Sequence, residues 1–366
     1  MFKTISSFEN LLQAYSLCLK DNRYKQSRME FDFNLEENLA KLQWLLQNGF
    51  YKPYPYTYFT VCDSKKRNIA APAFRDRVIQ HALVLQIEPL FEKQFIFDSY
   101  ACRKAKGTHF GLRRLKKFLQ AARSVHGKNT AIYVLQADIQ KFFPGVSWDI
   151  LLRLIKRKIT DPLVFELIRR IVVFHRVCRP NKKSLAFFNQ SLSLRERRGL
   201  PIGNLTSQLF ANIYLNELDG FVKQNLKIRW YGRYMDDFFI ISSDKENLKN
   251  VKKAMQIFLE EKLRLSLHPQ KTIIQNVSLG VPFVGYRVFY DHILVRGKTL
   301  LRMSRKYKAR KKQKAKGWLS QKSFEATQAS LRGHLKFANT HNLSKYFFRE
   351  KQSESLNGYL GLEPVS

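Results

Sequence analysis

The chain is poor in cysteine and in long apolar runs. Its four cysteines are far apart in 366 residues and form no CxxC pair, and its eight histidines include no HExxH. A disulfide framework and a structural zinc site are therefore not expected. No apolar stretch reaches the ~18 residues that a membrane-spanning helix needs, so we expect no membrane partner. The cysteines are Cys18, Cys62, Cys102 and Cys178.

Acidic residues are also scarce, which leaves a strongly basic chain. Lys and Arg number 65 against 29 Asp and Glu, so the net charge is +36. A globular chain this basic repels itself unless it works against a polyanion, and nucleic acid is the natural partner through phosphate contacts. An anionic membrane surface is the alternative, which the lack of a long apolar stretch disfavours. Hydrophobic residues at 45% and aromatic residues at 13% supply a large packed core, which argues against disorder.

Two simple targeting and nucleotide-binding signals are missing. The first 20 residues carry Glu9 and an amphipathic pattern, and they do not resemble a signal peptide. The segment Gly297-Lys298-Thr299 resembles the end of a phosphate-binding loop, but His292 stands where the first glycine of that loop belongs. We therefore expect a soluble, cytoplasmic protein that is not a P-loop ATPase.

Two adjacent acids stand out in the stretch RWYGRYMDDFFIISSD at 229–244. Asp236 and Asp237 lie there among aromatic and β-branched residues. Adjacent carboxylates repel, and burying either without a partner costs free energy. A β-hairpin with the acids at its turn is the simplest structural explanation, but tight hairpin turns favour Asn-Gly or Asp-Gly, and no glycine is present. The pair therefore indicates a site in which a cation compensates the repulsion.

Asp138 is a third acid in a similar setting, within AIYVLQADIQKFFPGV. The β-prone run Ile132–Leu135 leads directly to it. Capping a following turn or helix is one explanation of this acid. The other is that Asp138 meets Asp236 and Asp237 across neighbouring strands. Three carboxylates would then offer the hard oxygen ligands that two Mg²⁺ ions, about 3.5–4 Å apart, require in phosphoryl transfer.

Hydrophobic periodicity predicts the elements around these acids. Helices are predicted at 36–47, ended by Gly49, at 75–94, at 204–221 and at 246–263. Asn204 or Thr206 could cap the helix at 204–221, and a strand pair is predicted within 271–288. Nine basic residues and no acid fill 302–316, before a helical C-terminal region. Such a run is typical of a solvated face or flexible arm, and a basic helical lobe that grips a duplex is the alternative.

The motifs occur in the order in which reverse transcriptases carry them. Tyr234-Met235-Asp236-Asp237 resembles the YxDD box of that family, and Asp138 followed five residues later by Phe143 resembles its first palm motif. The segments RNIAAPAFRDRVIQ, SYACRKAKGTHFGLRRL, GLPIGNLTSQLFANIYLNELD, LHPQKT and FVGYRV resemble successive blocks of bacterial reverse transcriptases. The resemblance extends from about Tyr51 to Arg287.

This resemblance implies an α+β right-hand polymerase with fingers, a palm built on an antiparallel sheet, and a helical thumb. The enzyme would be an RNA-directed DNA polymerase of a bacterial or phage-infected bacterial cell, with two Mg²⁺ ions, dNTPs, a template RNA and a cDNA/RNA duplex as its partners. Its parts would be an N-terminal helical extension at 1–49, the first part of the fingers at 50–131, a palm at 132–290 with a fingers insertion around 161–198, and a basic helical thumb at 291–366.

One departure narrows the family. Most reverse transcriptases carry Gln-Gly followed by Ser-Pro in the block before YxDD, whereas this chain has IGNLTSQ at 202–208. That variant resembles diversity-generating retroelements, whose enzymes copy a template-repeat RNA into cDNA mutated at adenines, usually with a pentameric accessory variability protein. Another bacterial reverse transcriptase, of the group II intron, retron or phage-defence type, is the alternative. A non-catalytic RNA-binding protein is a third possibility, but it would have no use for the acid cluster.

The resemblance also assigns the metal site. Asp138 and Asp236 would be the principal metal ligands, with Asp237 beside them and the backbone carbonyl of Ile139 completing the shell. These three acids are also the predicted catalytic residues.

Further residues are assigned by resemblance to the nucleotide and the primer. Phe143 would lie beneath the incoming sugar and exclude a 2′-hydroxyl, although core packing is its alternative role and would suit Phe142 better. The predicted dNTP-binding residues are Lys65, Arg67, Phe143, Ile202 and Lys271, and the predicted primer grip is Phe283, Val284, Gly285 and Tyr286. A solvated basic loop is the alternative for Lys65 and Arg67, and simple packing beneath the helix near Asn204 is the alternative for Ile202.

Overall fold

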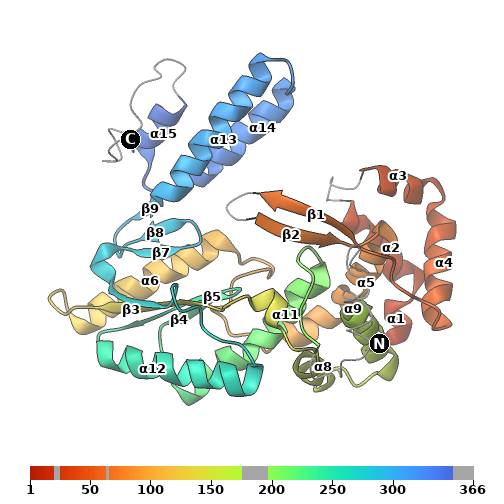
Figure 1. Cartoon of the computed structure of the whole chain (residues 1–366), viewed down its shortest axis with the longest axis horizontal. Helices are drawn as coiled ribbons and strands as arrows, with labels where there is room; N and C mark the ends of the chain where they lie inside the picture. The colour runs from red at the N-terminus through yellow and green to blue at the C-terminus, as the bar shows by residue number, and fades with distance from the viewer. Residues whose placement is uncertain (20–24, 63–65, 175–196, 349–366) are drawn as a thin grey trace. The chain divides into compact units, whose positions relative to one another are not determined.

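The computed structural model describes residues 1–19, 25–62, 66–174 and 197–348 (Figure 1). The chain divides into two compact units. Both units are assembled from segments that are far apart in the sequence. Unit 1 comprises Met1–Cys102, Gln136–Phe238 and Lys249–Thr272, and unit 2 comprises Arg103–Leu135, Phe239–Leu248 and Ile273–Ser366. All three predicted catalytic acids belong to unit 1.

Unit 1 is mainly helical at its N-terminal end. α2 (Phe8–Cys18) begins at Ser7, whose hydroxyl accepts a hydrogen bond from the backbone N–H of Asn10. Its buried residues recur every three or four positions, so that one apolar face packs against α5 (Phe74–Glu92). The remaining helices are α1 (Phe2–Ile5), α3 (Lys25–Phe33), α4 (Leu35–Gln47), α7 (Phe142–Gly145), α8 (Trp148–Lys156), α9 (Pro162–Phe174) and α11 (Leu205–Gly220).

Two helices continue into wider π-helical turns. α11 packs against both α5 and α8 and is followed by the π-helical segment Phe221–Asn225. α12 (Lys245–Phe258) begins in a segment of unit 2, continues into unit 1 and is followed by the π-helical segment Leu259–Leu263.

The strands near the predicted site fall into two sheets. β1 (Thr57–Cys62) and β2 (Lys66–Ala71) form an antiparallel pair with Thr57 opposite Ala71. A second sheet has the strand order β4–β5–β3–β6, made of β3 (Tyr133–Asp138), β4 (Tyr231–Tyr234), β5 (Asp237–Ser242) and β6 (Ile273–Asn276). Four successive residues of β5, from Phe238 to Ile241, are buried, so both faces of this strand are covered.

Unit 2 carries its own core. It contains an antiparallel sheet of β7 (Val281–Phe283), β8 (Tyr286–Val288) and β9 (Ile293–Val295). α6 (Thr108–His126) contacts this sheet at β8. α13 (Gly297–Ala315) and α14 (Gln321–Lys336) form a helical hairpin, and α15 (His341–Phe347) packs on α14. These three helices bury a shared apolar cluster of Leu300, Met303, Leu331, Leu335 and Phe347.

Most elements expected from periodicity are confirmed. α4 ends at Gln47 and Gly49 follows with φ 72°, as the helix stop at that glycine predicts. The basic run at 302–316 lies mostly on α13 and is therefore helical. Asn204 is the N-cap residue of α11, as predicted, but its side chain makes no capping hydrogen bond.

The predicted subdomain boundaries stay a prediction, because the two compact units cross them. Residues 175–196 of the predicted fingers insertion lie outside the described residues. Among the helices that the structure describes, none is both long enough and apolar enough to cross a bilayer.

We expect Leu83→Ala to lower the free energy of unfolding by about 2–5 kcal/mol, because it leaves a cavity in a packed helical layer. Leu83 lies on α5 and is fully buried. Urea unfolding followed by circular dichroism would measure the change. Leu12→Ala on α2 is the matched control, because Leu12 is 40% exposed, and an equal loss in both variants would contradict the packing described here.

Candidate active site

The Asp236–Asp237 pair lies at the turn of a tight β-hairpin. β4 ends at Tyr234 and β5 begins at Asp237, so Met235 and Asp236 are the only residues between the strands. Met235 adopts φ 58°, a left-handed conformation that costs a residue with a side chain on the order of 1 kcal/mol or more. The backbone therefore forms the hairpin considered above. Met235 takes the left-handed position in which a tight turn usually has glycine.

Asp138 ends β3 and is held against a second segment of unit 1. Its carbonyl accepts a hydrogen bond from His268 N at 2.7 Å, and Gln140 N donates to Ser266 O at 2.9 Å. Ile139 is buried and lies opposite Leu267 in an antiparallel bridge. Residues 266–268 therefore pair with 138–140 through an isolated antiparallel bridge.

This pairing places Lys271 beside Asp138. The chain turns after His268, with Lys271 N donating to His268 O at 3.2 Å. The ammonium Nζ of Lys271 then lies 2.5 Å from Asp138 Oδ2. The side chains of Lys271 and Asp138 are 38% and 14% exposed, so the ion pair is partly shielded from solvent. Lys271, which the sequence predicts to contact the nucleotide, is thus paired with one of the three predicted catalytic acids.

The three acids influence one another strongly. Loss of solvent around the Asp237 carboxyl raises its pKa to about 7, with repulsion from Asp236 and Asp138 adding to the effect, although the residue as a whole remains exposed on one side. The pKa of Asp236 is also raised, first by burial and then by the charge of Asp138. Lys271 and Arg67 act in the opposite direction on Asp236. The structure therefore brings these five residues into one electrostatic site.

The donor set fits a divalent cation. Carboxylate oxygens are the hard ligands that Mg²⁺ prefers, and a cation would offset the burial and the repulsion that together raise the pKa of Asp236 and Asp237. In the described part of the chain, no three Asp, Glu, His or Cys side chains already stand in the arrangement of a metal site. One Asp138 oxygen is already paired with the Lys271 ammonium. The metal role of Ile139 stays a prediction.

The two adjacent phenylalanines after Asp138 have different surroundings. Phe142 is 2% exposed and belongs to the core, whereas Phe143 is only half-buried. Their rings meet edge to face at a centroid distance of 5.3 Å. The backbone of Phe143 is also fixed, because its carbonyl accepts a hydrogen bond from Leu200 N at 2.8 Å. This division favours the core role for Phe142 and leaves the Phe143 ring available to a ligand.

The segment Ile202–Asn204 is tied to the β1–β2 hairpin. The carbonyl of Ile202 accepts a hydrogen bond from Ala70 N at 2.9 Å, and Asn204 Nδ2 donates to the Tyr56 hydroxyl at 2.8 Å. The side chain of Asn204 is thus engaged by Tyr56 instead of capping α11. The sequence gives no sign of this role of Tyr56, because no local pattern links it to Asn204, 148 positions away.

The basic residues predicted on the fingers are placed only in part. Arg67 lies on β2 with an exposed side chain, within electrostatic reach of Asp236. Lys65 lies outside the described residues.

The predicted primer grip forms the β7–β8 turn of unit 2. Phe283 and Tyr286 are buried, and Tyr286 donates its hydroxyl to His334 O at 3.0 Å. Between them Val284 and Gly285 both have positive φ, 38° and 92°. Because the rings of Phe283 and Tyr286 belong to the core, Val284 and Gly285 are the part of the predicted primer grip that could contact a primer. The primer-grip assignment stays a prediction.

The family of the chain follows from a comparison with known proteins. Residues 60–288, more than half of the chain, match the family described as reverse transcriptase (RNA-dependent DNA polymerase). The chain belongs to this family. The predicted α+β right-hand polymerase class and the predicted enzyme class, RNA-directed DNA polymerase, are confirmed at this level.

Similar proteins include bacterial and intron-encoded ones. Protein YkfC of Escherichia coli (strain K12) is 26% identical over 277 residues, which cover 66% of this chain and 69% of YkfC. Group II intron-encoded protein LtrA of Lactococcus lactis subsp. cremoris is 25% identical over 318 residues, covering 69% of this chain and 50% of LtrA. The chain therefore spans about half the length of LtrA. Among solved structures, the match to apo telomerase from Candida tropicalis covers 72% of this chain and 55% of the telomerase chain, with 12% sequence identity and a TM-score of 0.48.

We expect Gly203→Ala to destabilise the Ile202–Asn204 segment by about 1–3 kcal/mol. Gly203 has φ 118°, and a Cβ there would lie 2.8 Å from Ile69 Cγ2 and 3.2 Å from Ala70 O. Gly127→Ala is the control, because Gly127 also has a positive φ, 86°, but a Cβ there would meet no atom within 4 Å. Thermal unfolding of both variants would separate the contact from the backbone strain, and equal losses would contradict the close approach.

Proposed function

We propose that this chain is the reverse transcriptase of a diversity-generating retroelement, which copies a template-repeat RNA into cDNA mutated at adenines. The observation that carries the polymerase activity is the gathering of Asp138, Asp236 and Asp237, with the pKa of two of them raised. The retroelement type is supported by IGNLTSQ at 202–208, in place of the usual Gln-Gly and Ser-Pro block.

The acid cluster would hold two Mg²⁺ ions, with Asp138 and Asp236 as principal ligands. Bound there, the ions would activate the primer 3′-hydroxyl and offset the charge of the leaving pyrophosphate. Arg67 and Lys271 would bind the triphosphate through their positive charge, so Lys271 would exchange Asp138 for phosphate as the nucleotide enters. Phe143 would lie against the sugar, and Ile202 would border the nascent base pair.

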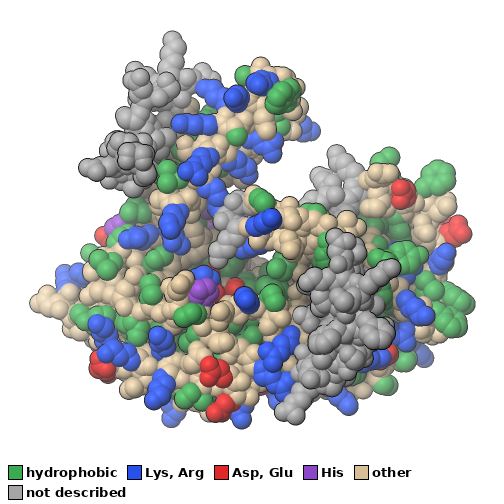
Figure 2. Space-filling view, in the orientation of Figure 1, with side chains coloured by type: hydrophobic (Ala, Val, Ile, Leu, Met, Phe, Trp, Pro, Cys, Tyr) green, Lys and Arg blue, Asp and Glu red, His purple; other side chains and the backbone are tan. Residues whose placement is uncertain are grey.

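The basic helical hairpin of unit 2 would hold nucleic acid. Lys and Arg side chains gather on α13 and α14 in the view of Figure 2, and no acid occurs on α13. Contacts of this kind release counterions from phosphate and are independent of base sequence. The same surface would accommodate template RNA, the cDNA/RNA duplex or a pentameric accessory protein.

A group II intron type of reverse transcriptase is the second candidate. The similarity to LtrA, a group II intron-encoded protein, favours it. The two functions differ in their products, because only the first predicts errors concentrated at template adenine. Sequencing the cDNA made by the protein on its own element's RNA, with and without the accessory protein, would distinguish them. A nearby pair of template and variable repeats in the genome would be an independent sign of the first.

We expect Asp236→Asn to lower the rate of dNTP incorporation by on the order of 10³-fold or more, because it removes a metal ligand worth several kcal/mol in the transition state. RNA affinity should not fall, since a negative charge near phosphate is lost. Primer extension and filter binding would measure the two quantities. Asp244→Asn is the matched control, because Asp244 is exposed and its Oδ1 accepts from Asn247 N, a capping role that asparagine can also fill. Incorporation at the parental rate by Asp236→Asn would rule out the acid cluster as the catalytic site.

We expect Phe143→Ala to raise the use of ribonucleotides relative to dNTPs by roughly 10- to 100-fold, because the space left by the ring would accept a 2′-hydroxyl. Single-nucleotide incorporation with matched dNTP and rNTP would measure the ratio. Phe142→Ala removes the buried neighbouring ring and should lower stability without changing this ratio. If Phe143→Ala discriminates as the parent does, the sugar must be sensed by another residue.

We expect Ile202→Gln to lower misincorporation opposite template adenine more than opposite the other bases. A glutamine amide can hydrogen-bond the incoming nucleotide, whereas isoleucine offers only apolar contact. Each kcal/mol of discrimination regained is worth about fivefold in fidelity. Deep sequencing of the cDNA would measure the errors, and Ile202→Leu, which keeps an apolar side chain, should retain them. Unchanged errors at adenine in Ile202→Gln would assign the infidelity to other residues or to the accessory protein.

A further inference from the structure

A fully buried arginine precedes the strained turn that carries the acids. Arg233 lies on β4, two residues before Met235, and has no exposed surface. Its charge is balanced by Asp219 on α11, which is also fully buried. Two charges removed from water in this way are costly, so the pair requires a full set of hydrogen bonds. The polymerase function assigned above gives no role to either residue.

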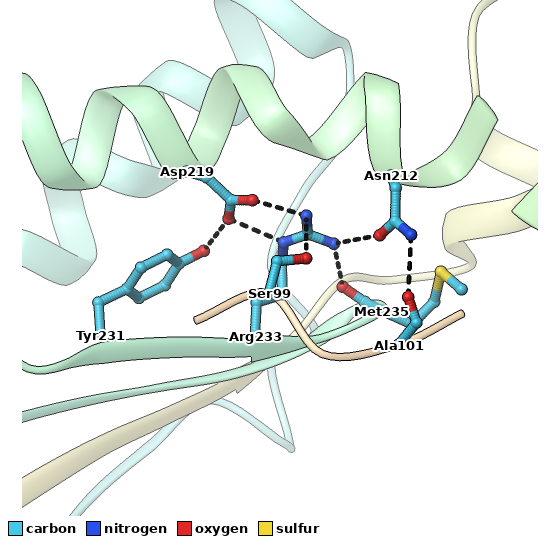
Figure 3. Close-up of polar contacts among 7 residues, drawn as sticks. All are labelled: Ser99, Ala101, Asn212, Asp219, Tyr231, Arg233 and Met235. Carbon is cyan, nitrogen blue, oxygen red and sulfur yellow. Dashed lines mark hydrogen bonds and ion pairs between the residues drawn. The ribbon is translucent and has the colours of Figure 1, made fainter. Parts of the chain in front are cut away.

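The pair is joined by two parallel hydrogen bonds. Arg233 Nε donates to Asp219 Oδ1 at 2.8 Å, and Arg233 Nη2 donates to Oδ2 at 2.6 Å (Figure 3). The Tyr231 hydroxyl donates to the same Oδ1 at 2.7 Å and fixes the carboxylate from the other side. The guanidinium plane is therefore locked to the side chain of α11.

The remaining guanidinium donors are also used. Nη2 donates to Ser99 Oγ at 3.2 Å, and Nη1 donates to Asn212 Oδ1 at 3.3 Å and to the carbonyl of Met235 at 3.0 Å. Asn212 is itself oriented by its Nδ2, which donates to Ala101 O at 2.9 Å. All five N–H groups of the arginine thus have partners, and one of these partners is the backbone of the acidic turn.

The backbone of Arg233 is fixed as well. Its N–H donates to Asp98 O and its carbonyl accepts from Tyr100 N, both at 2.9 Å. The guanidinium therefore reaches the Met235 carbonyl from an anchored strand. Because Met235 has φ 58°, its peptide needs an outside contact to hold a conformation that the residue itself disfavours. Asp236 follows directly, so the orientation of this peptide sets the direction of the acids.

We propose that Arg233, clamped by Asp219, is a positioning residue that holds the Met235 peptide and thereby directs Asp236 and Asp237 into the catalytic cluster. This assignment rests on the catalytic role proposed above for those acids. The fork of the guanidinium is essential to it, because a lysine ammonium can balance Asp219 but cannot hold the carboxylate, Asn212 and the turn in fixed directions at once.

The test is Arg233→Lys, which keeps the charge and removes the fork. The expected result is a folded protein whose kcat for dNTP incorporation is lower by on the order of 10- to 100-fold, with KM for dNTP and RNA affinity unchanged, because small displacements of catalytic groups act on the chemical step. Rates are normalised to the burst amplitude so that only active molecules are counted.

Two comparisons separate positioning from simple destabilisation. Leu83→Ala weakens the fold away from the turn and should leave the normalised kcat at the parental value. Met235→Gly removes the left-handed strain, so Arg233→Lys should reduce kcat less in the Met235→Gly background than in the parent. Equal losses in both backgrounds, or a normalised kcat of Arg233→Lys equal to that of the parent, would overturn the proposal.

A second variant covers the case in which Arg233→Lys does not fold. Asn212→Ala leaves the ion pair intact but removes a partner of Nη1, the nitrogen that holds Met235, and should reduce kcat without changing KM. A parental kcat in this folded variant would also overturn the proposal. Asp236→Asn distinguishes a failure of the catalytic assignment from a failure of the positioning role. If Asp236→Asn polymerises normally, the catalytic assignment itself fails. If Asp236→Asn is inactive and Arg233→Lys is fully active, only the positioning role of Arg233 fails.

Discussion

Mutual repulsion among three carboxylates is the constraint around which the centre of unit 1 is built. Burial and then the charges of the neighbouring acids raise the pKa of Asp236 and Asp237, and this unfavourable state has to be stabilised by the surrounding chain. Lys271 supplies part of the compensation through its ion pair with Asp138. The acid cluster therefore favours positive charge at one place, and a polyphosphate substrate with its cations can supply that charge. A purely structural acid pair would not require it.

The scaffold around this cluster consists mainly of backbone and buried polar contacts. Asp138 is positioned by the main-chain pairing of 138–140 with 266–268, and the Asp236 turn is reached by the guanidinium of Arg233. Such contacts hold a group in direction as well as in place, whereas apolar packing mainly fixes distance. A site in which like charges must be kept together needs directional restraint, because each acid would otherwise relax away from its neighbours.

The sequence predicts well what depends on local pattern. The strand that ends at Asp138, the helix that stops before Gly49 and the helix that follows Asn204 are recognisable from periodicity and turn chemistry. It predicts poorly what depends on partners distant in the chain. No local pattern near Lys271 indicates that Asp138 is its partner. Likewise, the side chain of Asn204 donates a hydrogen bond to Tyr56 instead of capping α11. The left-handed Met235 was unexpected for the same reason, since only the folded environment can hold a methionine in that conformation.

The hydrogen bond between Ala70 N and Ile202 O has an evolutionary consequence. It joins the two segments through main-chain atoms alone, so it is indifferent to which side chain stands at position 202. The side chain at position 202, which we propose borders the nascent base pair, can therefore change without breaking this hydrogen bond. If position 202 sets copying accuracy as proposed, selection on accuracy is separated there from selection on this attachment, and a single substitution could change fidelity while the two segments stay joined.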